Sequence, residues 1–179
     1  LDEFQRRFIL DVYDNPRAKT KKAILSIGRK NGKTALIAGI LLAHLDGPEA
    51  IENSQIVSGA MSRKQAALVY KAASKMVRLS KSLRDRVRIV PSQKQLFGPS
   101  KNVEDEALSA EGATNEGLSP VLAILDEAGQ VKGATSDFID AIVTSQGAYD
   151  DAMLMIISTQ AASDAAFLSI EIDDALSGE

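Results

Sequence analysis

The chain contains the stretch Ala23-Ile24-Leu25-Ser26-Ile27-Gly28-Arg29-Lys30-Asn31-Gly32-Lys33-Thr34, and this stretch decides its fold. Its first five residues, four of them apolar, are typical of a short buried strand. The glycines then lead into a helix that we expect over 33–45. A glycine loop between a strand and a helix N-terminus can close its backbone N–H groups on phosphate oxygens. The stretch therefore predicts a phosphate-binding loop, with Lys33 neutralising phosphate and the Thr34 hydroxyl ligating Mg²⁺.

The loop departs from the usual spacing at one position. The common phosphate loop has four residues between its first glycine and the Gly-Lys pair. That spacing would need a glycine at position 27, where this chain has Ile27. From this motif alone, a strand–helix turn that carries Gly-Lys-Thr by chance stays an alternative.

The remaining chain alternates short β-type runs with longer helical patterns. This alternation predicts an α/β fold in three layers, with a central, mainly parallel sheet flanked by helices. We expect strands over 55–60, 88–90, 121–125 and 153–157, a hairpin over 93–103, and helices over 63–80 and 136–145.

An acidic pair, Asp126 and Glu127, follows the apolar run 121–125. A carboxylate at the end of a buried strand can hold Mg²⁺ through water, and a glutamate beside it can deprotonate an attacking water. Alternatively, Asp126 only caps the next turn. Together with the upstream phosphate loop, the pair predicts nucleotide hydrolysis. The triplet 158–160 (Ser158, Thr159 and Gln160) follows the last apolar strand and is a candidate sensor of the γ-phosphate, although ordinary turns use the same residue types.

The formal net charge of −3 hides an uneven distribution of charges. Residues 61–101 carry 11 basic side chains and one acidic, whereas residues 102–179 carry one basic and 16 acidic. At 100° per residue, a helix over 63–80 has a basic stripe opposite its apolar face, formed by Lys64, Lys71, Lys75 and Arg78. Three interpretations stay open for this stripe: contact with DNA phosphates, contact with an acidic neighbouring subunit, or a solvated helix face.

Composition excludes several classes of protein. The chain has no cysteine, which rules out disulfides and thiolate metal sites. The single histidine, His44, argues against a histidine zinc site, and we expect a structural role for it. The sequence offers no apolar run long enough for a bilayer and no signal peptide, so we expect a soluble, cytosolic protein. Because the chain starts at Leu1 rather than Met, we expect a processed or excised fragment.

The order of these motifs resembles the N-terminal ATPase domain of the large terminase subunit of tailed bacteriophages. Phe4-Gln5 is similar to that family's adenine-side glutamine motif. Residues 29–34 are similar to its deviant Walker A loop, which has an early basic residue and often lacks the first glycine, so that Ile27 fits. Residues 108–111 and 117–120, leading into 125–128, resemble the approach to its Walker B strand, and 158–160 resemble its coupling motif.

The resemblance implies a P-loop ATPase of the additional-strand, catalytic-glutamate type, with ATP and Mg²⁺ as cofactors. It implies that ATP hydrolysis drives double-stranded DNA into a procapsid. Glu127, Lys33 and Arg29 would be catalytic, and Thr34 and Asp126 would hold Mg²⁺. The nucleotide would contact Gln5, Gly28, Arg29, Lys30, Asn31, Gly32, Lys33 and Thr34.

The resemblance also implies partners. These are the portal protein, the small terminase subunit, and further copies of the chain in a pentameric ring at the portal vertex in the host cytoplasm. The isolated fragment would be a monomer, and a neighbour would supply an arginine finger, for which Arg63, Arg84 and Arg86 are candidates. A helicase-like P-loop translocase and a nucleotide-gated assembly module with little turnover stay as alternatives.

The resemblance divides the chain into an ATPase domain over 1–165 and an acidic tail, or the start of a linker, over 166–179. The family's nuclease domain would be absent, and we expect no nuclease activity. Glu171, Asp173 and Asp174 are interpreted as a solvated acidic helix or linker rather than a metal site.

Overall fold

A computed structural model describes residues 1–16, 19–111, 117–161 and 163–177. Seven strands form one sheet: β1 (Lys22–Ser26), β2 (Gln55–Ala60), β3 (Arg88–Val90), β4 (Gln95–Gly98), β5 (Val103–Ser109), β6 (Pro120–Asp126) and β7 (Met153–Ser158). The α-helices are α1 (Glu3–Tyr13), α2 (Lys33–Asp46), α3 (Arg63–Leu79), α4 (Lys81–Arg86), α5 (Asp137–Ser145) and α6 (Phe167–Ser177). Two single-turn 3₁₀ helices, η1 (Ala128–Gln130) and η2 (Gln146–Ala148), complete the described elements.

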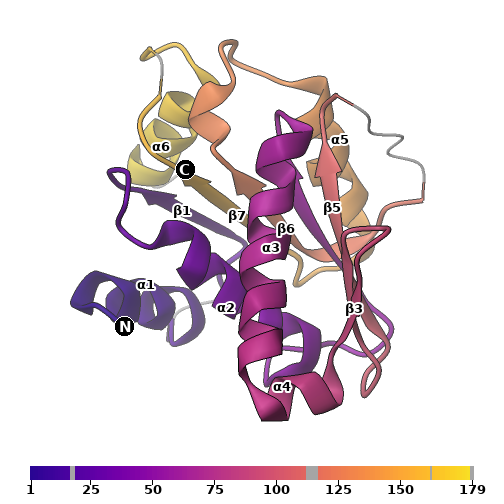
Figure 1. Ribbon diagram of the computed structural model, residues 1–179. Coiled ribbons are helices and arrows are strands. Elements are labelled where there is room, and N and C mark those ends of the chain that lie inside the picture. Colours follow the sequence, from indigo (N-terminus) through magenta and orange to yellow (C-terminus); the bar gives the residue numbers. More distant parts are fainter. Residues whose placement is uncertain (17–18, 112–116, 162, 178–179) are drawn as a thin grey trace.

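The sheet has the strand order β1-β7-β6-β2-β5-β4-β3 (Figure 1). The five strands from β1 to β5 in this order are parallel, and β4 and β3 are antiparallel additions at one edge. The predicted α/β fold with a mainly parallel sheet is therefore confirmed.

Helices cover both faces of the sheet and create two apolar clusters. Buried residues of α1, α2 and α3 pack on one face, and those of α5 and α6 pack on the other. Every residue of the central strand β6 is buried, as expected for a strand covered on both sides. The helix α2 is apolar over most of its surface because it lies between the sheet, α1 and α3.

The helix α3 has the predicted two faces. Ala66, Val69, Tyr70, Ala73 and Val77 are buried against the core, while the basic stripe is exposed. Its start is defined by the side chain of Ser62, which accepts a hydrogen bond from the backbone N–H of Gln65.

Two elements were not predicted as such. The hairpin over 93–103 exists, but its second strand, β5, continues to Ser109 and pairs with β2. No apolar run marks this extension, because three successive acidic residues occupy 104–106. The helix α1 was also missed, although its glutamine had been singled out. Several predicted boundaries moved by one residue: β1 covers Lys22–Ser26, α2 ends at Asp46 and α3 ends at Leu79.

The helix α6 joins the core through its first turn. Phe167 and Leu168 are buried in the second cluster, and Lys22 on β1 forms an ion pair with Glu171, with Nζ and Oε2 2.5 Å apart. Asp173 and Asp174 are exposed. The division of the chain after residue 165 stays a prediction. Among the described helices, none is both long and apolar enough to cross a membrane.

A carboxyl group is buried in the middle of the sheet at Asp105. Its side chain is fully buried on β5, and in the register of the sheet it lies between Ile56 of β2 and Leu96 of β4. The hydroxyl of Ser58 donates to Oδ1 at 3.0 Å, while Oδ2 has no hydrogen-bond partner in the described part of the chain. Burial raises the pKa of this carboxyl to about 7.

We predict that the free energy of unfolding falls less with rising pH in Asp105→Asn than in the parent chain. The pKa of Asp105 is higher in the folded chain, so the folded chain holds one extra proton between about pH 4 and 7. The free energy of unfolding therefore falls as pH rises through this window, by at most about 1.4 kcal/mol per pH unit. Asparagine keeps an oxygen for Ser58 and does not titrate. Urea unfolding at about pH 5 and pH 7 measures the difference, and an equal pH dependence in both proteins would contradict the prediction.

Candidate nucleotide-binding site

The carboxyl ends of β1, β7 and β6 lie next to each other at one edge of the sheet. Ser26 is paired in register with Ser158, and Asp126 with Ile157, so the segments that follow the three strands meet. Ligands of open α/β sheets bind at this edge. The phosphate loop, the acidic pair and the polar triplet are thus brought to one place.

The loop after β1 turns tightly into α2. Lys30 and Gly32 have left-handed backbone conformations, with φ of 65° and 71°. The side-chain amide of Asn31 donates to the carbonyl oxygen of Gly28 at 3.1 Å and closes the turn. Gly28, Arg29, Lys30, Asn31 and Gly32 are all exposed, so the loop is accessible to a ligand.

The side chain of Lys33 lies inside this loop. Its residue is only 7% exposed, and its ammonium donates to the carbonyl oxygens of Ile27 and Gly28, both at 3.1 Å. Thr34 follows in the first turn of α2 and is half-buried. The first turn of a helix also has backbone N–H groups without partners in the helix. The loop thus offers an anion both backbone donors and a fixed positive charge.

The helix α1 places Gln5 against the same loop. Gln5 is buried, and its side-chain Oε1 accepts a hydrogen bond from the backbone N–H of Asp2 at 3.0 Å. Its amide Nε2 lies 3.0 Å from the position that a Cβ on Gly32 would occupy. Any larger residue at position 32 would therefore press on Gln5 as well as strain the backbone.

The acidic pair lies across from Lys33. Asp126 is only 5% exposed, and burial, with a contribution from Glu127, raises its pKa to about 6, while the charge of Lys33 opposes this shift. Glu127 is half-buried and has a left-handed backbone, with φ 55° and ψ 42°. Non-glycine residues rarely adopt this conformation, and it directs the chain out of β6 into η1.

Ser158 connects the phosphate loop to the acidic turn. It is fully buried at the end of β7. Its hydroxyl accepts a hydrogen bond from the backbone N–H of Gly129 at 2.8 Å, and its carbonyl oxygen accepts one from Ile27 at 3.2 Å. Ser158 therefore fixes the backbone of η1 on one side of β7 and the start of the phosphate loop on the other.

Thr159 contacts the same two neighbouring segments, but through their side chains. Its hydroxyl donates to Oε2 of Glu127 at 3.3 Å, and its carbonyl oxygen accepts a hydrogen bond from the Ser26 hydroxyl at 2.6 Å. Gln160, the third residue of the triplet, is exposed.

Sequence reasoning missed two residues of this arrangement, Ser26 and Gly129. A Cβ on Gly129 would lie 2.5 Å from the carbonyl oxygen of Gln160 and 2.7 Å from the Ser158 hydroxyl oxygen. The signal in the sequence was a glycine two residues after Asp126-Glu127, where a close approach of two backbones is expected. Ser26 gave no signal beyond being the polar residue in an apolar strand.

The donor atoms present fit Mg²⁺ bound together with a nucleotide. The Thr34 hydroxyl and the Asp126 carboxylate are oxygen ligands, which Mg²⁺ prefers. Within the described residues no group of three or more His, Asp or Glu could hold a metal ion. Mg²⁺ commonly completes its ligands with phosphate oxygens and water, and a divalent cation would stabilise the ionised form of the buried Asp126.

Other predicted residues lie elsewhere. His44 is buried near the C-terminal end of α2, where its Nε2 pairs with the Tyr13 hydroxyl at 2.8 Å. Arg84 and Arg86 belong to α4, beyond the C-terminal end of α3. Arg63 begins α3, and its guanidinium donates to the carbonyl oxygen of Glu111 at 3.5 Å.

The fold and these contacts define a class of protein. A phosphate loop after β1, an acidic pair at the end of β6 and a polar triplet at the end of the strand between them define a P-loop nucleotide-binding domain. Within this class, the family model for the ATPase domain of the terminase large subunit matches residues 3–171. The chain belongs to this family.

Individual relatives agree with this assignment. The chain is 64% identical, over 179 residues, to the terminase large subunit of Enterobacteria phage HK97, and the match covers 100% of this chain and 35% of that protein. The crystal structure of the HK97 large terminase superposes with a TM-score of 0.95 at 65% identity, over 99% of this chain and 37% of that one. The chain therefore spans about a third of the length of these relatives.

A more distant relative shares the fold. The large terminase ATPase domain of Thermus phage P74-26 matches with a TM-score of 0.67 at 20% identity, over 86% of this chain and 64% of that one.

We predict that Gly129→Ala impairs hydrolysis more than it impairs folding. The added methyl group would force η1 away from the end of β7 and displace Glu127. Misplacing a catalytic group by about 1 Å can cost on the order of 10²-fold in rate. Gly147→Ala is the matched control, because nothing lies within 4 Å of a Cβ at that position. Turnover of ATP and thermal unfolding should be measured for both variants, and equal turnover would contradict the prediction.

Proposed function

We propose that this chain hydrolyses ATP to ADP and phosphate with Mg²⁺, and that this hydrolysis drives double-stranded DNA into a procapsid. The observation that carries the proposal is the hydrogen bond between Thr159 and Glu127, made beside Lys33 and Asp126 at the end of the sheet. Membership in the terminase ATPase family supports ATP as the substrate and DNA as the cargo.

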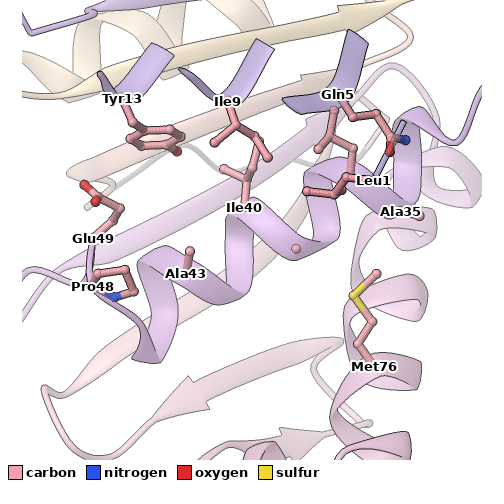
Figure 2. A pocket seen from close by; sticks show the side chains of 12 residues that line it. Leu1, Gln5, Ile9, Tyr13, Ala35, Ile40, Ala43, Pro48, Glu49 and Met76 are labelled. Atoms are coloured by element: carbon pink, nitrogen blue, oxygen red, sulfur yellow. The ribbon is translucent and has the colours of Figure 1, made fainter. Parts of the chain in front are cut away.

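The adenine ring would lie at the Gln5 end of a groove between α1 and α2. The groove has a volume of about 530 Å³ and mostly apolar walls, to which Ile9, Ile40 and Met76 contribute. Figure 2 shows Gln5 at one end beside Leu1 and Ala35, and Tyr13 with Glu49 at the other. An apolar slot with a polar group at its end is the usual form of a base-binding site. Gln5 would donate to the base with its amide Nε2, which already faces the loop.

The phosphates would bind in the loop. Its backbone N–H groups and the N-terminus of α2 favour negative charge, and the ammonium of Lys33 moves from the loop carbonyls to the β- and γ-phosphates. Arg29 is exposed beside the loop and would neutralise the charge that develops on the γ-phosphate.

Bound Mg²⁺ would be held by Thr34 and Asp126, and would neutralise phosphate charge during the reaction. Glu127 acts as the general base. Its carboxylate accepts a proton from water, the water oxygen attacks the γ-phosphorus, and ADP leaves. Because the hydroxyl of Thr159 donates to Oε2 of Glu127, it orients this carboxylate.

The proposed oligomeric state and partners are inferred from membership in the family. We propose that copies of the chain act in a pentameric ring at the portal vertex, with the portal protein and the small terminase subunit as partners, in the host cytoplasm. A neighbouring copy would supply the arginine finger. Of the candidates, Arg63 starts the helix that follows β2, at the same edge of the sheet as the phosphate loop.

Glu127→Gln should abolish ATP hydrolysis and leave ATP binding intact. The amide has nearly the shape of the carboxylate and accepts no proton, so a loss on the order of 10²-fold or more is expected. Glu52→Gln, at an exposed position, is the control. Phosphate release should be followed at several protein concentrations, because a trans-acting arginine needs assembled copies. Retained turnover in Glu127→Gln would remove the assigned role.

Lys33→Ala should weaken nucleotide binding itself. The substitution removes the one buried ammonium of the loop, which is the charge opposite the phosphates. Titration with a fluorescent ATP analogue measures the affinity, and Lys21→Ala, an exposed lysine outside the loop, is the control. An affinity equal to that of the parent chain would refute the phosphate-binding role of residues 28–34.

A further inference from the structure

The exposed side of α3 carries a line of positive charge. Lys64, Lys71, Lys75 and Arg78 are all exposed, and within the described residues none of them forms an ion pair. We call these four residues the α3 stripe. Four cations without a partner on one side of a helix are poorly explained as a stabilising feature, because like charges at helical spacing repel.

The length of the stripe matches a run of phosphates. From residue 64 to residue 78 the helix rises by about 21 Å at 1.5 Å per residue. One strand of duplex DNA places a phosphate about every 3.4 Å along its axis, so about six phosphates lie along this length. The stripe therefore has the extent needed to follow a nucleic-acid backbone.

The helix α4 extends the positive surface. Ser80 ends α3 and accepts a hydrogen bond from the backbone N–H of Leu83 at the start of α4. Arg84 is tied to the end of the stripe, since its Nη1 donates to the carbonyl oxygen of Arg78 at 3.0 Å. Lys81 and Arg84 are both exposed. The two consecutive helices thus present six exposed cations: Lys64, Lys71, Lys75, Arg78, Lys81 and Arg84.

The packing of α3 limits the mode of contact. Val69, Ala73 and Val77 hold its opposite face in the core, so only the side of α3 that carries the α3 stripe is available to a ligand. The only aromatic residue of α3 and α4, Tyr70, is also buried, which leaves these helices without a surface for stacking unpaired bases. The lysine and arginine side chains of the stripe are suited to contact with the phosphates of a duplex, and such contact does not read sequence.

The acidic surface of a second copy fits the stripe less well. The acidic excess of residues 102–179 is spread over several elements: part lies on β5 and at the end of β6, and part on α5 and α6, which pack on the other face of the sheet. Part of it is already neutralised, since Lys19 pairs with Asp151 and Lys22 with Glu171. None of the described helices carries four acidic residues in a line comparable with the α3 stripe.

We propose that the α3 stripe, continued by Lys81 and Arg84, binds the phosphate backbone of duplex DNA without regard to sequence. The choice of DNA as the ligand rests on the proposed function, whereas the binding itself does not require ATP hydrolysis. Sequence-neutral contact suits a motor, because every step along the DNA meets the same chemical groups.

Binding should be measured by fluorescence anisotropy with a labelled duplex of about 30 base pairs of random sequence, without nucleotide. The test variant is Lys71→Gln with Lys75→Gln. The matched control is Arg6→Gln with Lys21→Gln, which removes the same charge from exposed positions elsewhere. Each neutralised phosphate contributes about 0.9 to the slope of log K against log salt concentration. The test variant should therefore lower this slope by about 1.8, and the control should keep it.

When the salt concentration rises from 50 to 200 mM, the affinity of the control for DNA should fall by a factor about ten times larger than that of the test variant. Circular dichroism melting of both variants checks that the fold is kept. Equal slopes, or no binding of duplex by the parent chain, would overturn the proposal. Unchanged DNA binding with a loss of self-association in sedimentation would overturn it in favour of a second copy as the partner. Because no nucleotide is present, a chain that fails to hydrolyse ATP still gives a decisive result.

Discussion

Hydrogen bonds at the end of β7 hold the two halves of the site, the phosphate loop and the acidic turn, in place. Ser158 uses its backbone carbonyl to hold the start of the phosphate loop and its hydroxyl to hold the turn after β6. Thr159 adds contacts with Ser26 and Glu127 on the same two sides. Hydrogen bonds of this kind contribute only about 1 kcal/mol each to stability. Their importance lies in geometry, because they set the distance between the phosphate loop and the carboxylate of Glu127.

Burial makes the electrostatics of the site interdependent. Lys33 and Asp126 are both nearly enclosed, and removing a single charge from water would be costly if the opposite charge were absent. Asp126 shows this conflict directly, since burial and Glu127 raise its pKa while Lys33 lowers it. The left-handed backbone at Glu127 adds a local cost of about 1–3 kcal/mol. The contacts of Ser158 with Gly129 and of Thr159 with Glu127 offset part of this cost and hold the turn in place.

Sequence alone predicted the elements whose information is local. The apolar runs of β6 and β7, the Gly-Lys-Thr loop and the two faces of α3 each follow from spacing within a few residues. The features that no local pattern predicts depend on distant neighbours. Asp105 is buried only because β2 and β4 enclose it. Gln5, which only the family resemblance brought to the nucleotide, meets the phosphate loop because α1 packs along α2. No pattern within residues 103–109 or 3–13 contains these contacts, since their partners lie far along the chain.

The helix α2 links the nucleotide to the surface proposed for DNA. Its first residue is Lys33, and its last residue, Asp46, accepts a hydrogen bond from Ser100 at 2.6 Å and pairs with Arg86 of α4 at 3.2 Å. Between these ends, fully buried side chains of α2, such as Leu41, pack in the same cluster as Val69 and Val77 of α3. Close-packed protein interiors transmit a displacement of one element to its neighbours. Through α2 the phosphate loop and the helix that carries the α3 stripe are joined by one packed cluster, so a displacement at the loop would reach the surface proposed for DNA through the core of the domain.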